Sequence, residues 1–251
     1  MPPDAPPDAP PPPPPRALLK VLALHGFSQD AHAFRGKLGA VRKALKSTCE
    51  LTFLDAPHSV KGAFDDDAGA DASASAPSTS QSRAWFTSGE NARCGARKAS
   101  DEGWTRPAMS TSYVGFEETV ALARDALAAN GGEFDGIIAF SQGSTAAVAL
   151  LAAIPELRRA KFVALVAGFS PRDEDMLASI RNAAPFTTPS LHIHGDADAL
   201  VTRERVRELA EFFHAPDFFF HDGAHGVPTS AAKRLKQFIN DVAASSQTIA
   251  R

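Results

Sequence analysis

Short apolar runs and helix-like stripes alternate along the chain. Apolar runs lie within residues 16–26 and 50–58 and over 134–140, 161–167, 190–194 and 217–220. Runs of this length, bounded by polar turns, are typical of buried strands. Strands that alternate with helices predict βαβ units, and therefore a mainly parallel sheet with helices on both faces.

Apolar residues spaced three or four positions apart predict the helices. Phe34, Leu38, Val41 and Leu45 share one face of a helix, and Phe116, Val120, Ala123 and Leu127 share one face of another. Helices are also expected over 142–153, 203–213 and 229–243. In the last of these, Leu235, Phe238, Ile239 and Val242 form the apolar face.

Two stretches do not follow this alternation. Residues 1–15 are proline-rich and are expected to be a disordered tail in the polyproline-II conformation. Residues 60–112 form an insert whose polar, low-complexity part, "DDDAGADASASAPSTSQS", is expected to be disordered. We therefore expect one domain over residues 16–245, interrupted by a variable, partly disordered insert.

Composition excludes several classes of function. The net charge is −3, so a nucleic-acid partner is not expected. No apolar run reaches about 18 residues, so no membrane span is expected, and the first residues do not resemble a secretory signal. The two cysteines, Cys49 and Cys94, are too few for a disulfide framework or a zinc site and are expected to be free thiols. No cofactor or metal motif is present.

The stretch "FDGIIAFSQGSTAAVALL", residues 134–151, places Ser141 between a predicted strand and a predicted helix. It nearly matches the G-x-S-x-G nucleophile elbow of α/β-hydrolases, but Ala139 replaces the first glycine. The chemistry needs small residues on both sides of the serine, because strand and helix approach each other closely there. Ala139 and Gly143 meet this need. The alternative is a serine that only caps the helix.

A serine nucleophile needs an acid and a histidine, which follow it in the order Ser, Asp, His in this fold. "HGDADALV" offers Asp196 and Asp198, and the turn from Gly195 to Val201 favours Asp198. His225 lies between Gly223 and Gly226 in a loop after the last strand, so it is favoured as the base. His214 and His221 are the alternatives, while His192 and His194 precede the acid.

Two backbone N–H groups are candidates for an oxyanion hole. Gln142 begins the helix after the serine, and Phe27 follows the first strand in "LALHGFSQD". Each such donor is worth about 3 kcal/mol to the reaction. A nucleophile turn, an acid turn and a glycine-flanked histidine, each after its own strand and in the required order, indicate a catalytic serine.

With these motifs the sequence resembles the FSH family of serine hydrolases, in particular the branch typified by the ovarian-cancer-associated esterase. The resembling segments include "KVLALHGFSQDAHAF", "RAWF", "FDGIIAFSQGS", "SLHIHGDADALV" and "GAHGVP". The resemblance implies an α/β-hydrolase fold, a triad of Ser141, Asp198 and His225, no cofactor, and a cytosolic or nuclear location.

The expected reaction is hydrolysis of a small-molecule carboxylic ester through an acyl-enzyme. An acyl thioesterase would use the same residues, and a non-catalytic binding protein is a further alternative. A dehalogenase or an epoxide hydrolase is disfavoured because the elbow carries serine in place of aspartate. Trp85, Phe86 and Trp104 of the insert either line an acyl pocket or fix the insert onto the core.

Overall fold

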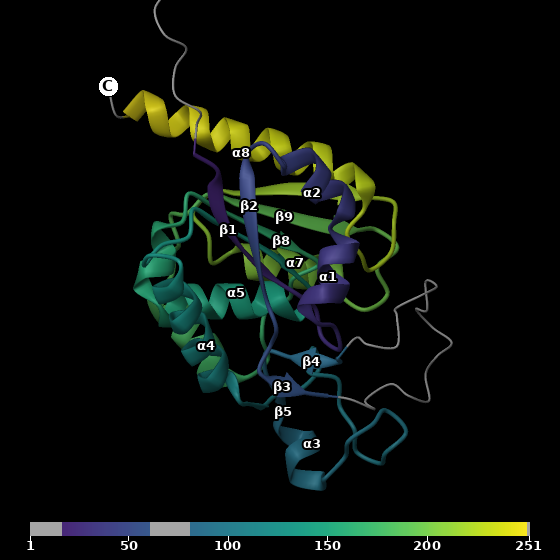
Figure 1. Ribbon diagram of the computed structural model, residues 1–251. Helices are drawn as coiled ribbons and strands as arrows, with labels where there is room; N and C mark the ends of the chain where they lie inside the picture. Colours follow the sequence, from purple (N-terminus) through teal and green to yellow (C-terminus); the bar gives the residue numbers. More distant parts are fainter. Residues whose placement is uncertain (1–16, 61–80, 250–251) are drawn as a thin grey trace, which may run out of the picture.

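A computed structural model describes residues 17–60 and 81–249. It has three layers, a central sheet with helices on both faces (Figure 1). The predicted tail, residues 1–15, and residues 65–80 of the polar insert segment lie outside the described residues.

The central sheet contains six strands, all parallel, in the order β10-β9-β8-β7-β1-β2. The prediction of a mainly parallel sheet is therefore confirmed. The strands are β1 (Leu19–Leu24), β2 (Cys49–Leu54), β7 (Gly136–Phe140), β8 (Phe162–Val166), β9 (Ser190–Gly195) and β10 (Pro216–His221).

Two apolar clusters hold the helices to the two faces of the sheet. On one face pack α4 (Phe116–Ala129), α5 (Gln142–Ala153), α6 (Glu174–Ala183) and α7 (Arg203–Ala210). On the other pack α1 (Ala31–Lys37), α2 (Gly39–Leu45) and α8 (Thr229–Ile249). Neighbouring strand residues divide between the clusters: Ile137 joins the first and Ile138 the second. This alternation is the pattern of a sheet that is buried on both faces.

The first predicted helix is wrong in one respect. Phe34, Leu38, Val41 and Leu45 are all buried on one side, as expected, but they belong to two helices that meet at Leu38. Gly36 and Gly39 flank this break, and glycine disfavours a continuous helix. Two further elements, α6 and a short 3₁₀ helix, Pro155–Arg159, were not predicted from the sequence.

The described part of the insert and the residues on either side of it carry regular structure that was not predicted from the sequence. Two short antiparallel pairs form, β3 (His58–Ser59) with β4 (Arg83–Ala84) and β5 (Thr87–Ser88) with β6 (Tyr113–Val114), and α3 (Gly89–Cys94) follows β5. The Glu90 carboxylate joins α3 to residues 110–111 by accepting hydrogen bonds from Ser110 and Thr111. Burial opposes its ionisation, but these hydrogen bonds prevail and lower the pKa of Glu90 to about 2.

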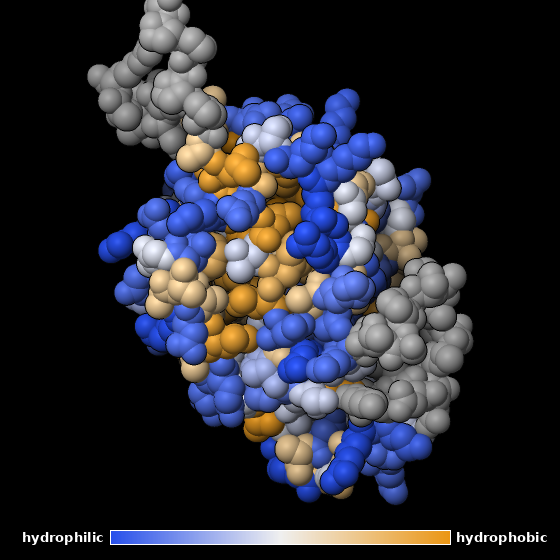
Figure 2. All heavy atoms as spheres, in the orientation of Figure 1, coloured by the Kyte–Doolittle hydropathy of each residue, from blue (hydrophilic) through white to orange (hydrophobic). Residues whose placement is uncertain are grey.

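One face of the molecule exposes apolar residues at the edge of the sheet. β2 is the last strand on this side, and Leu19, Leu51 and Phe53 are only partly buried there. Figure 2 shows apolar residues gathered on this face between α4 and the α1–α2 pair. Within residues 17–60 and 81–249, no helix has the length and apolar character needed to cross a bilayer.

His192, in the middle of β9, is fully buried. Its Nε2 lies 3.2 Å from the Ser190 hydroxyl, and its Nδ1 has no partner among the described residues. Burial lowers the pKa of His192 from 6.5 to about 3. The unfolded chain therefore binds a proton at this residue near pH 6.5, whereas the native state stays neutral until about pH 3. Acidification through this window favours unfolding.

Substituting His192 with leucine is expected to weaken the pH dependence of stability. Between pH 7 and pH 5 the wild-type residue accounts for a loss of about 2 kcal/mol in the free energy of unfolding, which the variant lacks. Urea unfolding at the two pH values measures the difference. The exposed His32, replaced by leucine, controls for loss of a histidine as such. Equal pH dependence in His192→Leu and wild type would contradict the expectation.

Candidate active site

Ser141 stands in a strained turn between β7 and α5. Its backbone has φ 52° and ψ −120°, a region that L-residues rarely adopt. Its N–H donates to the Val166 carbonyl at 2.8 Å, and the Ser144 hydroxyl donates to the same carbonyl at 3.1 Å. Although Ser141 occupies the cap position of α5, its side chain makes no capping hydrogen bond. The capping alternative therefore does not explain this serine.

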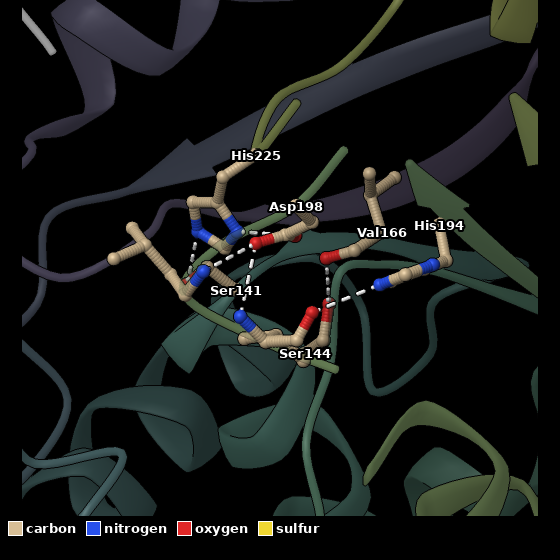
Figure 3. A network of polar contacts seen from close by, with 8 residues as sticks. Ser141, Ser144, Val166, His194, Asp198 and His225 are labelled. Carbon is tan, nitrogen blue, oxygen red and sulfur yellow. Dashed lines mark hydrogen bonds and ion pairs between the residues drawn. The ribbon is translucent and has the colours of Figure 1, made fainter. Parts of the chain in front are cut away.

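A chain of hydrogen bonds joins Ser141 to His225 and Asp198 (Figure 3). The Ser141 Oγ lies 2.9 Å from His225 Nε2, and His225 Nδ1 lies 2.7 Å from Asp198 Oδ2. The other carboxylate oxygen of Asp198 accepts the N–H groups of Leu200 and Val201 at 2.8 and 2.9 Å. Three side chains from three separate loops thus meet at the carboxyl end of the sheet.

The Asp198 carboxyl is suited to remain ionised. Its side chain is completely buried, which opposes charge. The hydrogen bonds from His225, Val201 and Leu200 outweigh this burial, so the pKa of Asp198 lies below its ordinary value. An ionised carboxylate in this place accepts the Nδ1–H of His225 and leaves Nε2 as an acceptor toward the serine hydroxyl.

Backbone hydrogen bonds join the turn that carries Asp198 (the acid turn, residues 195–201) to the loop that carries His225 (the histidine loop, residues 221–228). Asp196 N–H donates to the His221 carbonyl at 2.6 Å, and Ala197 N–H donates to the Gly223 carbonyl at 3.1 Å. A Cβ on Gly195 would lie 2.1 Å from the Gly223 oxygen, so only glycine fits there. His194 adds a hydrogen bond from Nε2 to the Val201 carbonyl at 2.9 Å.

The other sequence candidates lie elsewhere. Asp196 pairs with Arg203 and is about half exposed. His214 is exposed beyond α7, and the Nδ1 of His221 accepts the Gly223 N–H at 3.0 Å. His192 and His194 are buried within β9. None of these four histidines hydrogen-bonds to Ser141 among the contacts of the described residues.

The two oxyanion-hole candidates flank the serine. Gln142 is the first residue of α5, where backbone N–H groups lack partners within the helix. Phe27 follows Gly26, and a Cβ on Gly26 would lie 2.9 Å from the Phe140 ring and 3.4 Å from the Cβ of Ser141. The turn that carries Phe27 is thus packed directly against the elbow.

The Gln142 side chain has a role that the sequence analysis missed. Its Oε1 accepts the Trp85 N–H at 3.0 Å, and its Nε2 donates to the Phe86 carbonyl at 2.8 Å. Trp85 Nε1 in turn donates to the His25 carbonyl at 2.7 Å. The residue after Ser141 therefore connects the elbow, the insert and the first strand. The sequence does contain a signal for this role: Gln142 has a long amide side chain, although the residues around Ser141 are mostly small.

Replacing Gln142 with leucine is expected to lower the free energy of unfolding by about 3 kcal/mol. The change leaves the Trp85 N–H and the Phe86 carbonyl buried without partners, and each such group costs about 1–3 kcal/mol. Chemical denaturation measures the loss. Gln81→Leu, at an exposed glutamine, is the matched control and should change stability by no more than about 0.5 kcal/mol. A Gln142→Leu protein as stable as this control would contradict the expectation.

The aromatic residues of the insert differ in their surroundings. Trp85 and Phe86 are 1% and 0% exposed and pack in the apolar cluster beneath the sheet, so they fix the insert onto the core. Trp104 instead lines a hollow of about 460 Å³ together with Phe27.

Ala139 and Gly143, on the two sides of Ser141, have different surroundings. A Cβ on Gly143 would lie 2.4 Å from the His25 carbonyl oxygen and 2.5 Å from that of Leu24, both fixed backbone atoms. Ala139 already carries its methyl group and pairs regularly with Leu24 and Leu165 in the sheet. The glycine requirement of the elbow therefore falls on Gly143.

Gly143→Ala is expected to destabilise the protein by about 1–3 kcal/mol, because β1 and α5 must move apart. We expect it to lower catalytic turnover at this candidate site as well, since the same movement displaces Ser141. Ala139→Gly is the matched change on the other side, and its cost is about 0.5–1 kcal/mol in a strand. Thermal unfolding and turnover of both variants test this, and a large gain in turnover for Ala139→Gly would show that its methyl group strains the elbow.

No group of three or more His, Cys, Asp or Glu side chains suited to a metal ion occurs in the described part of the chain. Cys49 is buried and Cys94 exposed, and both are free thiols.

A family model and the related sequences agree on what this chain is similar to. A family model described as "Serine hydrolase (FSH1)" matches residues 16–237. Human esterase OVCA2 is 35% identical over 221 residues, which cover 86% of this chain and 92% of the human protein. Esterase C25G4.2 of Caenorhabditis elegans is 34% identical over 228 residues, covering 87% and 90% of the two chains.

Solved structures show the same architecture at lower sequence identity. Arabidopsis thaliana SOBER1 aligns with a TM-score of 0.59 at 18% identity, covering 90% of this chain and 99% of SOBER1. A Bacillus cereus carboxylesterase aligns with a TM-score of 0.56 at 13% identity, covering 90% and 89%. At such identities the likeness extends to the fold, which is that of the α/β-hydrolases.

Proposed function

The chain belongs to the FSH1 family of serine hydrolases and is a carboxylic-ester hydrolase, and on this premise we propose that Ser141, His225 and Asp198 carry out the cleavage. The observation that supports this assignment is the unbroken set of hydrogen bonds from Ser141 Oγ through His225 to Asp198. The three residues also occur in the order that this fold uses.

In the first half of the reaction, His225 Nε2 takes the hydroxyl proton of Ser141 as Oγ attacks the ester carbonyl. Asp198 holds the imidazole in the required tautomer and stabilises it once it is charged. The N–H groups of Phe27 and Gln142 donate to the oxyanion of the tetrahedral intermediate. His225 then gives its proton to the departing alcohol, leaving an acyl group on Ser141.

In the second half, His225 takes a proton from water, and the hydroxide attacks the acyl carbonyl. The second tetrahedral intermediate collapses, the acid leaves, and the proton returns to Ser141 Oγ. The strained backbone of Ser141 supports this role, because it holds Oγ clear of the end of β7, where a substrate can reach it.

Labelling with a fluorophosphonate tests the assignment. The reagent phosphonylates an activated serine, so we expect one adduct, on Ser141, when the labelled protein is digested and its peptides are sequenced by mass spectrometry. Ser144, buried on the same helix, is the internal control and should stay unmodified. Absence of an adduct on Ser141 would favour a binding protein with a hydrolase fold.

The expected substrate is a small-molecule acyl ester, and the thioester alternative uses the same residues. Turnover of a p-nitrophenyl ester and of the acyl-CoA with the same acyl chain separates the two. We propose the oxygen ester as the substrate, in line with the relatives named esterases. A markedly higher kcat/KM for the thioester would reverse this assignment.

A further inference from the structure

A hollow beside Phe27 lies near the proposed active site, and the reaction itself does not explain it. Its walls come from β3, β5, α3 and the loop that follows α3. The lining residues used in the argument below are Phe27, Thr87, Asn91, Arg97, Trp104 and Pro107. Its volume of about 460 Å³ lies within the range of small-ligand pockets, about 300–1,000 Å³. Figure 1 shows β5 and α3 beyond the end of the sheet where α5 begins.

The hollow adjoins one proposed oxyanion donor, Phe27, and is linked to the other, Gln142, through a neighbouring residue. Phe27 lines it directly. Gln142 reaches its wall through the hydrogen bond to the Phe86 carbonyl, and the next residue, Thr87, is part of the lining. Among the described lining residues, none comes from the 221–228 loop that carries His225. Because the leaving alcohol must face His225, the group that extends into the hollow is the acyl chain.

The wall is held rigidly by side-chain hydrogen bonds. Asn91 in α3 binds Thr105 twice, donating from Nδ2 to its carbonyl at 2.9 Å and accepting its N–H at 2.6 Å. Ser88 caps α3 by accepting the Asn91 N–H at 3.2 Å. A pocket fixed in this way needs little reorganisation when a ligand enters, which favours binding.

The charges around the hollow favour an anion. Arg97 is the only charged residue among the described residues that line it. The Arg106 Cζ lies 5.9 Å from the centroid of the Trp104 ring and adds a second positive charge close to that wall. Two carboxylates near the hollow are engaged in hydrogen bonds: Asp101 accepts the backbone N–H groups of Arg97 and Lys98 at 2.7 and 3.1 Å, and Glu90 accepts the hydroxyl of the lining residue Ser88 at 3.0 Å. Walls that are partly apolar, at Phe27, Trp104 and Pro107, and that carry a cation at one place suit an aliphatic chain that ends in a negative charge.

We propose that this hollow is the acyl subsite of the enzyme and that Arg97 selects acyl chains with a terminal carboxylate, as in half-esters of dicarboxylic acids. The inference rests on the proposed function, because it places the acyl carbonyl at Ser141. Trp104 and Pro107 contact the methylene chain, and the Arg97 guanidinium pairs with the distal carboxylate.

Two p-nitrophenyl esters of equal chain length test the proposal, the octanoate and the half-ester of suberic acid. Replacing Arg97 with glutamine is expected to raise KM for the suberate half-ester by about fivefold, as for loss of an exposed ion pair. The value of kcat should hold, because a contact remote from the carbonyl is equally strong in the ground state and the transition state. KM for the octanoate should change by less than about twofold.

Arg93→Gln is the matched control, since Arg93 lies on α3 but outside the lining and bonds to Ser112. It should leave both KM values unchanged, whereas Trp104→Ala should raise both. Equal KM ratios for the two esters in Arg97→Gln and wild type overturn the subsite, while hydrolysis of both esters, lost in Ser141→Ala, still supports the catalytic assignment. A wild-type enzyme that cleaves neither ester overturns both proposals.

Discussion

Alanine at position 141 is expected to lower kcat/KM for a p-nitrophenyl ester by about a million-fold, the loss that follows removal of the nucleophile in other serine hydrolases. Ser141 Oγ is the only atom of the elbow that hydrogen-bonds to His225 Nε2. Without it no acyl-enzyme forms, and the residual rate reflects substrate binding and the oxyanion donors alone. Steady-state kinetics measure the loss, and turnover within about tenfold of wild type would remove Ser141 from the mechanism.

A Ser141→Gly variant distinguishes the effect of losing the hydroxyl from the effect of backbone strain at this position. The backbone of Ser141, at φ 52° and ψ −120°, is unfavourable for alanine and serine alike but open to glycine. We expect Ser141→Gly to be as inactive as Ser141→Ala and more stable by about 1 kcal/mol. If the two variants unfold at the same denaturant concentration, the turn stores no strain that glycine relieves.

The second large effect is expected for Asp198→Asn, which should lower kcat by about ten-thousand-fold. The asparagine oxygen can still accept the N–H groups of Leu200 and Val201, so its amide nitrogen faces His225 Nδ1. An amide nitrogen only donates, and this forces Nδ1 to accept and Nε2 to carry the proton. The imidazole then cannot take the proton of Ser141.

Asp196→Asn is the matched control for this change. Asp196 lies in the same turn but pairs with Arg203, so its loss should alter kcat by less than about threefold. Comparing kcat for the two variants with one ester decides between the carboxylates. A larger loss in Asp196→Asn than in Asp198→Asn would exchange their roles.

The parallel sheet and its helices could be predicted because each buried element has its own apolar signature. β7 is apolar and α5 is apolar after its first turn, and the bounds predicted for α5 match those of the structure. The residues at the ends of the strands could also be nominated, because parallel strands bring their carboxyl ends to one edge. Ser141, Asp198 and His225 lie there and contact one another.

The insert could not be predicted in the same way, because long-range polar contacts hold it together. Trp85 and Phe86 depend on the Gln142 amide, and α3 depends on Glu90 reaching Ser110 and Thr111. Such contacts leave no periodic trace in the sequence. The break at Leu38 was missed for a related reason: one apolar stripe can be shared by two short helices that pack on the same surface.

The backbone hydrogen bonds between the acid turn and the histidine loop hold these two segments together, so that neither can move far without the other. The amide protons of Asp196 and Ala197 are bonded to carbonyls of the loop that carries His225. They can exchange with solvent deuterium only when that loop separates from the turn. The exchange rates of these two amides therefore report how often the loop that carries His225 leaves its place, without any substrate present. Compounds that bind between Ser141 and His225 could be ranked by the protection they give there.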